Sequence, residues 1–150
     1  MSAKFYLCKH CGNLIGMVQA SGVIPVCCGE EMQALEANTV EASREKHLPV
    51  VEAESTEYGT VLHVKVGSAP HPMIDAHYIP WIFVETEKGG QRRALRPGDA
   101  PEASFVVPAG DKAIAVYAYC NLHGLWKAEV QSHSKSLKCV VQTQALLSVF

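Results

Sequence analysis

Apolar and polar residues alternate with a period of two through much of the chain after residue 60. Such alternation is typical of strands that bury one face and expose the other. It predicts strands over 60–66, 79–85, 104–107, 112–119 and 125–130. Turn residues separate these strands at 88–90, 96–99 and 108–111. Helical periodicity is nearly absent, so we expect a mainly β fold built around an antiparallel β-sandwich. Residues 136–150 fit either a last strand or a short helix.

The first part of the chain has a different character. Residues 4–35 are rich in cysteine and glycine and have too few large apolar side chains to fold by burial alone. Metal would have to organise such a segment. A polar stretch over 36–44 then resembles a linker. We therefore expect two domains, 1–36 and 37–150, the second ending in a tail over 131–150.

Composition limits the choice of partners. The 150 residues carry a formal net charge of −2 and no basic stripe, which gives no support to a nucleic-acid or anionic-membrane partner. No apolar run is long enough to span a bilayer. The first residues run directly into a cysteine motif without an apolar stretch, so we expect a cytoplasmic protein. In that reducing compartment, clustered cysteines are more often metal ligands or catalytic groups than disulfides.

Four of the six cysteines form the first candidate site. Cys8-x-x-Cys11 brings two thiolates onto one metal through a tight turn, and the adjacent pair Cys27-Cys28 follows later. Neighbouring residues on a regular strand point to opposite faces, so this pair needs an irregular turn, helped by Gly29. Four thiolates suit iron or zinc, and the spacing does not choose between them. His10 lies between the first two cysteines, and we interpret it as exposed, since four sulfurs already close a site.

Histidines and one cysteine form the second candidate site, spread over three segments that end or interrupt the predicted strands. Loops gather at the two ends of a β-sandwich, where such donors can meet. Four imidazoles and one thiolate exceed the four ligands of a structural zinc and suit a five-coordinate iron with one open position. His63 and His133 lie on a predicted solvent face and in a polar segment, and are left out. The candidate donors are His47, His71, His77, Cys120 and His123.

These motifs together resemble the desulfoferrodoxin family. The resemblance rests on Cys8-x-x-Cys11 with Cys27-Cys28, Glu-Lys-His-x-Pro at 45–49, His-Pro-Met at 71–73, His-Tyr-Ile-x-Trp-Ile at 77–82 and Cys-Asn-x-His-Gly-Leu-Trp at 120–126. They occur in the family's order and cover nearly all of residues 1–130. The tail with Cys139 has no counterpart in the resemblance.

The resemblance implies a fold and a function. A desulforedoxin-like domain would hold one iron through Cys8, Cys11, Cys27 and Cys28, and an immunoglobulin-like sandwich would hold a second. The second iron would bind His47, His71, His77 and His123, with Cys120 axial. Glu45 and Lys46 match the family's functional pair beside the open position. The implied activity is that of a superoxide reductase, which reduces superoxide to hydrogen peroxide with electrons from rubredoxin or a similar donor, and a homodimer is expected.

Other functions compete with this interpretation. A superoxide dismutase would also have to oxidise superoxide, and the thiolate ligand argues against cycling without an outside donor. A zinc-stapled binding module would use both clusters as structural sites. A pure electron carrier would leave Glu45 and Lys46 without a role.

Overall fold

The computed structural model describes residues 2–131, so the predictions for His133, Cys139 and the segment 136–150 lie outside the described residues. Within this range no helix is long and apolar enough to cross a membrane. The elements in chain order are β1 Phe5–Leu7, β2 Leu14–Gly16, β3 Val26–Cys27, β4 Glu30–Glu31, β5 Gln33–Ala34, α1 Arg44–His47, β6 Pro49–Thr56, β7 Gly59–Val66, β8 Trp81–Thr86, β9 Gly89–Ala94, β10 Glu102–Pro108, β11 Ala113–Cys120 and β12 Gly124–Glu129.

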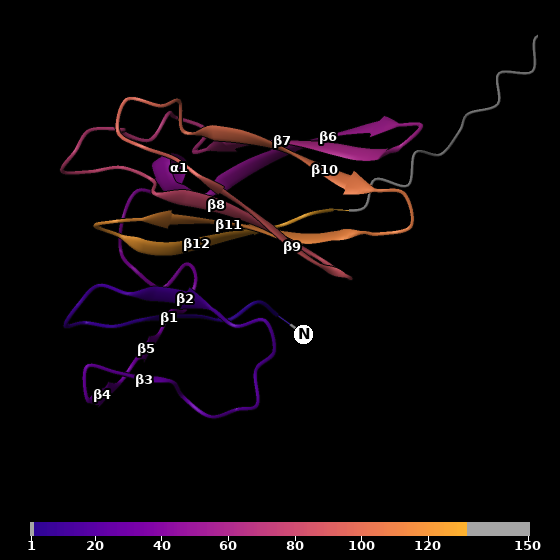
Figure 1. The fold of residues 1–150 in the computed structure, drawn as a ribbon. Helices are drawn as coiled ribbons and strands as arrows, with labels where there is room; N and C mark the ends of the chain where they lie inside the picture. Colours follow the sequence, from indigo (N-terminus) through magenta and orange to yellow (C-terminus); the bar gives the residue numbers. More distant parts are fainter. Residues whose placement is uncertain (1, 132–150) are drawn as a thin grey trace, which may run out of the picture.

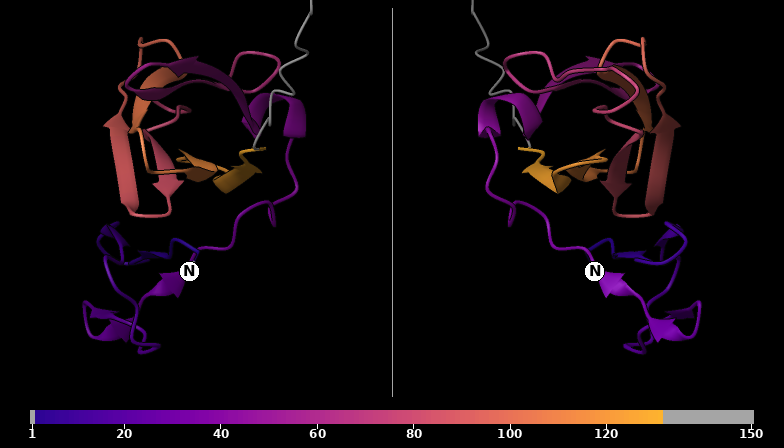
Figure 2. Two further views of the ribbon diagram at one scale, coloured as in Figure 1. Left: turned by 90° about the vertical axis from the view of Figure 1, so that its right-hand side faces the viewer. Right: turned by 90° about the vertical axis from the view of Figure 1, so that its left-hand side faces the viewer.

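Strands β6 to β12 form two antiparallel sheets, with the orders β10-β7-β6 and β12-β11-β8-β9. The sheets lie face to face (Figures 1 and 2), which confirms the mainly β fold and the sandwich. The five predicted strands correspond to β7, β8, β10, β11 and β12, with ends shifted by one or two residues. The two sandwich strands that were missed, β6 and β9, are edge strands with mostly exposed residues, so they carry little apolar alternation.

One predicted turn is placed differently. Gly89 and Gly90 were expected to lie in the turn, but they begin β9, and the turn falls on Glu87 and Lys88. A side chain at position 90 would collide with the ring of Phe83, so glycine here lets that ring cross the neighbouring strand. Gly90 therefore marks a close approach inside the sheet and not the turn itself.

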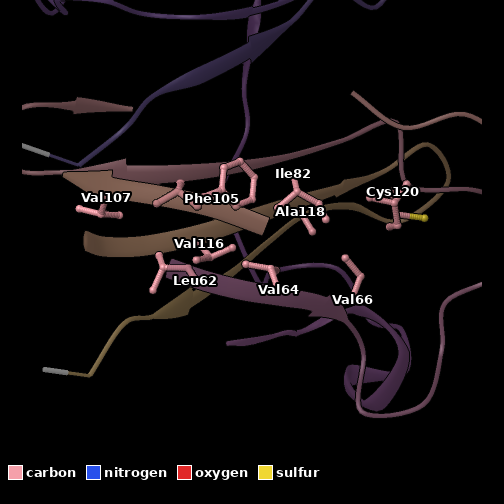
Figure 3. Packing of buried hydrophobic residues seen from close by; sticks show 11 residues of the cluster. Leu62, Val64, Val66, Ile82, Phe105, Val107, Val116, Ala118 and Cys120 are labelled. Carbon is pink, nitrogen blue, oxygen red and sulfur yellow. The ribbon is translucent and has the colours of Figure 1, made fainter. Parts of the chain in front are cut away.

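The main core fills the space between the two sheets (Figure 3). Leu62, Val64 and Val66 of β7 point inward, whereas the ring of His63 lies on the outer face within hydrogen-bond distance of Ser104 and Glu54. This outward position agrees with the predicted solvent face. Cys120 closes one end of the same buried cluster, so the core leads directly to the second candidate site.

The N-terminal module consists of the sheet β2-β1-β5 and the hairpin β3-β4. It lies against the outer face of the four-stranded sheet (Figure 1), where the ring of Phe5 packs 5.1 Å from Trp81 and 5.5 Å from Tyr117. The buried carboxylate of Glu85 accepts hydrogen bonds from the Ala3 N–H and the Tyr117 hydroxyl, both at 2.9 Å. Aromatic packing thus supports this module in addition to metal.

The predicted linker over 36–44 follows the edge of the sandwich. The side chain of Asn38 donates to the Lys127 carbonyl at 3.1 Å and accepts from the Lys127 N–H at 2.9 Å. Its own N–H donates to the Leu125 carbonyl at 3.0 Å. This segment therefore runs along β12 in one defined place before α1 begins.

Candidate metal centres

The first cluster lies in the N-terminal module, where Cys8 and Cys11 follow β1 and Cys27 ends β3. The sulfur atoms of Cys8, Cys11, Cys27 and Cys28 lie within 4.8 Å of one another. Cys28 and Gly29 form the two-residue loop of the β3-β4 hairpin, with φ of 52° and 77°. Two successive left-handed residues are what a type I′ hairpin turn requires. The predicted irregular turn is confirmed, and it turns both adjacent sulfurs toward the same point.

Proton affinities in this cluster are uneven. Hydrogen bonding from the Cys11 backbone lowers the pKa of Cys8 to about 6. Hydrogen bonding with the neighbouring cysteine side chains, that of Cys11 first, raises the pKa of Cys28 to about 12. Without metal, Cys28 therefore keeps a proton that a cation would replace, whereas Cys8 gives up its proton readily. His10 is exposed, as expected, and its imidazole pairs with Glu30 at the start of β4.

The second cluster lies at one end of the sandwich. His47 ends α1, His77 lies in the loop between β7 and β8, Cys120 ends β11, and His123 precedes β12. Their ligand atoms lie within 4.8 Å of one another. The ring of His71 joins them, with its centroid 4.8 Å from that of His47 and 4.6 Å from that of His77. All five donors suggested by the sequence therefore meet.

The rings are oriented by main-chain carbonyls. His47 donates from Nδ1 to the Ser43 carbonyl and His71 from Nδ1 to the Pro72 carbonyl, both at 2.6 Å, which leaves their Nε2 atoms for the cluster. His123 presents Nδ1 instead, 3.1 Å from the His47 Nε2 and 3.7 Å from the Cys120 sulfur. A second-sphere acceptor of this kind fixes the tautomer of metal-ligating histidines.

Two buried nitrogen atoms have no hydrogen-bond partner within the described chain, Nε2 of His71 and Nε2 of His77. An unpaired buried polar atom costs about 1–3 kcal/mol, so such atoms call for a ligand. Burial lowers the pKa of His71 to about 4 and also lowers that of His47, which keeps both imidazoles neutral. Neutral imidazoles are the form that binds metal. The donor set therefore fits a cation.

Sequence reasoning assigned no role to two further residues that support the cluster. Trp126 stacks on the ring of His47 at 4.9 Å, and its indole N–H donates to the His123 carbonyl at 3.2 Å. Gly67 contacts the residue that follows α1, because its N–H donates to the Leu48 carbonyl at 3.1 Å. Trp126 belongs to the motif at 120–126, which could have indicated its role. No sequence pattern around Gly67 indicates its role, since that role depends on a contact between distant segments.

Glu45 and Lys46 lie side by side on α1 and are exposed. The ammonium of Lys46 is among the causes that lower the pKa of His47 and His77, so its positive charge acts on the cluster. The carbonyl of Glu45 accepts a hydrogen bond from the Ala69 N–H at 3.1 Å, which ties the helix to the loop after β7. The structure thus holds the charged pair next to a donor histidine.

The sequence of this chain is similar to those of known proteins that form one family. The family model described as desulfoferrodoxin matches residues 39–129. The chain belongs to the desulfoferrodoxin family. Desulfoferrodoxin of Nitratidesulfovibrio vulgaris is 44% identical over 126 residues, which cover 84% of this chain and 95% of that protein. The superoxide reductase of Pyrococcus horikoshii is 36% identical over 100 residues, covering 58% of this chain and 87% of its own.

A solved structure extends the similarity to the arrangement of the chain. The crystal structure of the superoxide reductase from Treponema pallidum matches with a TM-score of 0.71 and 37% identity, covering 86% of this chain and all of that one. The family resemblance read from the motifs is therefore confirmed. Both donor sets fit mononuclear iron, one as Fe(Cys)4 and one as Fe(His)4(Cys), and the five donors of the second exceed the four of a structural zinc.

Proposed function

We propose that the protein is a superoxide reductase, which reduces superoxide to hydrogen peroxide at an iron in the second cluster. The observation that carries the proposal is the convergence of four imidazoles and one thiolate beside an exposed lysine. The relatives named superoxide reductase support it. The residues that would hold this iron are His47, His71, His77, His123 and Cys120.

Bound ferrous iron would supply the one electron that, with two protons, converts superoxide into hydrogen peroxide. The chain prepares the site for an anion, because neutral imidazoles leave the cation's charge only partly compensated by one thiolate. Lys46 adds a positive charge on α1, where it can attract superoxide toward a protein of net charge −2. His77 and His123 are only half-buried, so solvent protons and a small anion can reach their side of the cluster.

Glu45 would act at the open position of the site and help the product leave. Its support is its position two residues before His47 on the same exposed helix. Glu45 and Lys46 would then be the two residues of α1 that act on substrate and product at the site. The competing interpretation of Glu45 and Lys46 is a pair of solvated surface charges, and the kinetics of their alanine variants tests it.

The remaining parts of the proposal concern the setting of the reaction. Residues 1–36 would form a domain that holds the first iron through the four cysteines, and residues 37–150 would form the catalytic domain. A rubredoxin-like protein would return the spent electron. We also propose a cytoplasmic location, and we expect the homodimer that the resemblance to the family implies.

The deciding experiment combines metal analysis with visible absorption of the purified protein under anaerobic handling. We expect two irons per chain, and a thiolate-to-ferric band of the second site that appears when the reduced protein meets superoxide. Hydrogen peroxide should form without oxygen evolution. His77→Gln should abolish this reaction, whereas His63→Gln on the outer sheet face serves as a matched histidine control and should leave it intact.

Each competing function predicts a different result. Oxygen evolution in the absence of a donor would identify a dismutase. Reproducibly colourless, zinc-containing protein after iron-rich expression would identify a structural binding module. Two redox-active irons that take up and release electrons, yet do not react with superoxide, would identify an electron carrier.

A further inference from the structure

Asn121 joins the two loops that carry most of the second cluster. Its side-chain oxygen accepts from the Tyr78 N–H at 2.9 Å, and its side-chain NH2 donates to the Ala76 carbonyl at 3.1 Å. Its own N–H donates to the Tyr78 carbonyl at 3.2 Å. Three hydrogen bonds of Asn121 therefore hold the main chain immediately before and after His77.

Within residues 2–131, the ring of His77 lacks the main-chain carbonyl contact that holds the rings of His47 and His71. His47 lies on a helix, and the rings of His47 and His71 are each held by a main-chain carbonyl. His77 lies in the long loop between two strands, where its backbone makes an isolated bridge with Ile74. Its Nε2 atom is buried and meets no partner in the described chain, so no hydrogen bond from that atom holds the ring in place.

Asn121 also lies between two of the candidate metal ligands in the sequence. It follows Cys120 directly and precedes His123 by two residues, so it belongs to the turn that supplies two donors. A single amide thus links the turn carrying a thiolate and an imidazole to the loop carrying another imidazole. Any drift of one loop would change the distances between donor atoms that now lie within 4.8 Å.

We propose that Asn121 is a positioning residue that fixes His77 relative to Cys120 and His123. This inference rests on the proposed metal centre, although it does not depend on the substrate. Residues that orient metal ligands typically change metal affinity by 10- to 100-fold when they are replaced. We expect Asn121→Ala and Asn121→Leu to weaken iron retention at the second site within this range and to leave the four-cysteine site unchanged.

The test uses the full chain with two readouts besides activity. Hydrogen exchange of the Tyr78 amide in metal-free protein directly reports the loss of its hydrogen bond to the Asn121 side chain. Competition with a ferrous chelator, followed by the thiolate-to-ferric band of each site, reports what that loss does to iron. Leu122→Ala is the matched control, because Leu122 is exposed in the same turn. It should leave both readouts at their wild-type values.

A graded variant keeps the test decisive if the larger changes impair folding. Asn121→Asp retains the acceptor for the Tyr78 N–H but loses the donor to the Ala76 carbonyl, so we expect an intermediate loss of iron. Faster exchange at Tyr78 with unchanged iron retention and an unchanged band would overturn the inference. If iron binding depends on Asn121 while superoxide is not reduced, the inference stands and the proposed function fails.

Discussion

Replacing Gly67 with alanine should damage the second metal centre selectively. Gly67 follows β7 and has a φ of +85°. A Cβ atom there would overlap the Ala69 carbonyl oxygen and would lie 2.6 Å from the Glu45 carbonyl oxygen and 2.8 Å from the Lys46 carbonyl carbon. These are backbone atoms, so no side-chain rotation can relieve the collision. The helix that carries His47 would have to move.

The expected cost has two parts. A left-handed conformation costs a residue with a Cβ atom about 1–2 kcal/mol. Forcing extra volume into a packed site costs about 1–3 kcal/mol more. Together they predict a loss of about 2–5 kcal/mol in the free energy of unfolding. Displacement of α1 should also lower the occupancy of the second site by iron.

Gly110 provides a closely matched control. It has the same φ of +85°, but an added Cβ would meet only the Lys88 ammonium nitrogen, at 3.9 Å. It also precedes β11 at the end opposite Cys120, about 25 Å away along the strand. Gly110→Ala should therefore cost only the conformational part, about 1–2 kcal/mol, and should keep both irons.

The assay measures urea unfolding and the absorption of each iron site for both variants. Gly67→Ala should be the less stable variant and should lose the signal of the second site while keeping that of the four cysteines. Equal destabilisation of the two variants, with both sites filled in Gly67→Ala, would show that the contact between Gly67 and α1 does not hold His47 in place.

Three further changes test other parts of the structure. Lys46→Ala should slow the second-order reaction with superoxide several-fold at low salt and flatten its salt dependence; stopped-flow rates that keep their salt dependence would refute steering. Metal-free protein should lose stability as pH falls from 6.5 to about 4, because burial holds the folded pKa of His71 at about 4 and the unfolded chain binds the extra proton first. Urea midpoints at pH 7 and 4.5 measure this loss, and His71→Gln should reduce it. Glu85→Ala should cost about 1–3 kcal/mol by removing the acceptor of both the Ala3 N–H and the Tyr117 hydroxyl, and should speed proteolysis of the segment 36–43; Glu87→Ala on the exposed turn is the control, and equal proteolysis rates would argue against the contact.

The sequence predicted the strands that bury one face and the donors that stand in compact motifs. Leu62, Val64 and Val66 alternate with outward residues, so β7 was recognisable from its pattern alone. The edge strands β6 and β9 were not, because pairing with a neighbour forms them and most of their side chains face water. Period-two reasoning detects burial and therefore misses strands that bury little.

The candidate donors could be predicted because cysteine and histidine in short spacings have few other uses in combination. Their supports could not be predicted in the same way. Gly67, Asn121 and Trp126 act on segments that are distant in the sequence, and glycine, asparagine and tryptophan are common in many roles. The docking of Phe5 onto Trp81 was also missed, since the module's few apolar residues suggested that metal alone would organise it.

The two clusters differ in how far the chain prepares them for metal. In the second cluster, carbonyls of Ser43 and Pro72 already orient two rings, and burial already keeps the imidazoles neutral. In the first, the pKa of about 6 at Cys8 and of about 12 at Cys28 describe thiols of unequal acidity, and Cys28 keeps its proton until a cation replaces it. Because the sandwich has its own core, it should fold without metal, whereas the four-cysteine loops should gain much of their order when metal binds. Removing metal should therefore loosen the cysteine loops first, while Phe5 still anchors β1 to the sandwich.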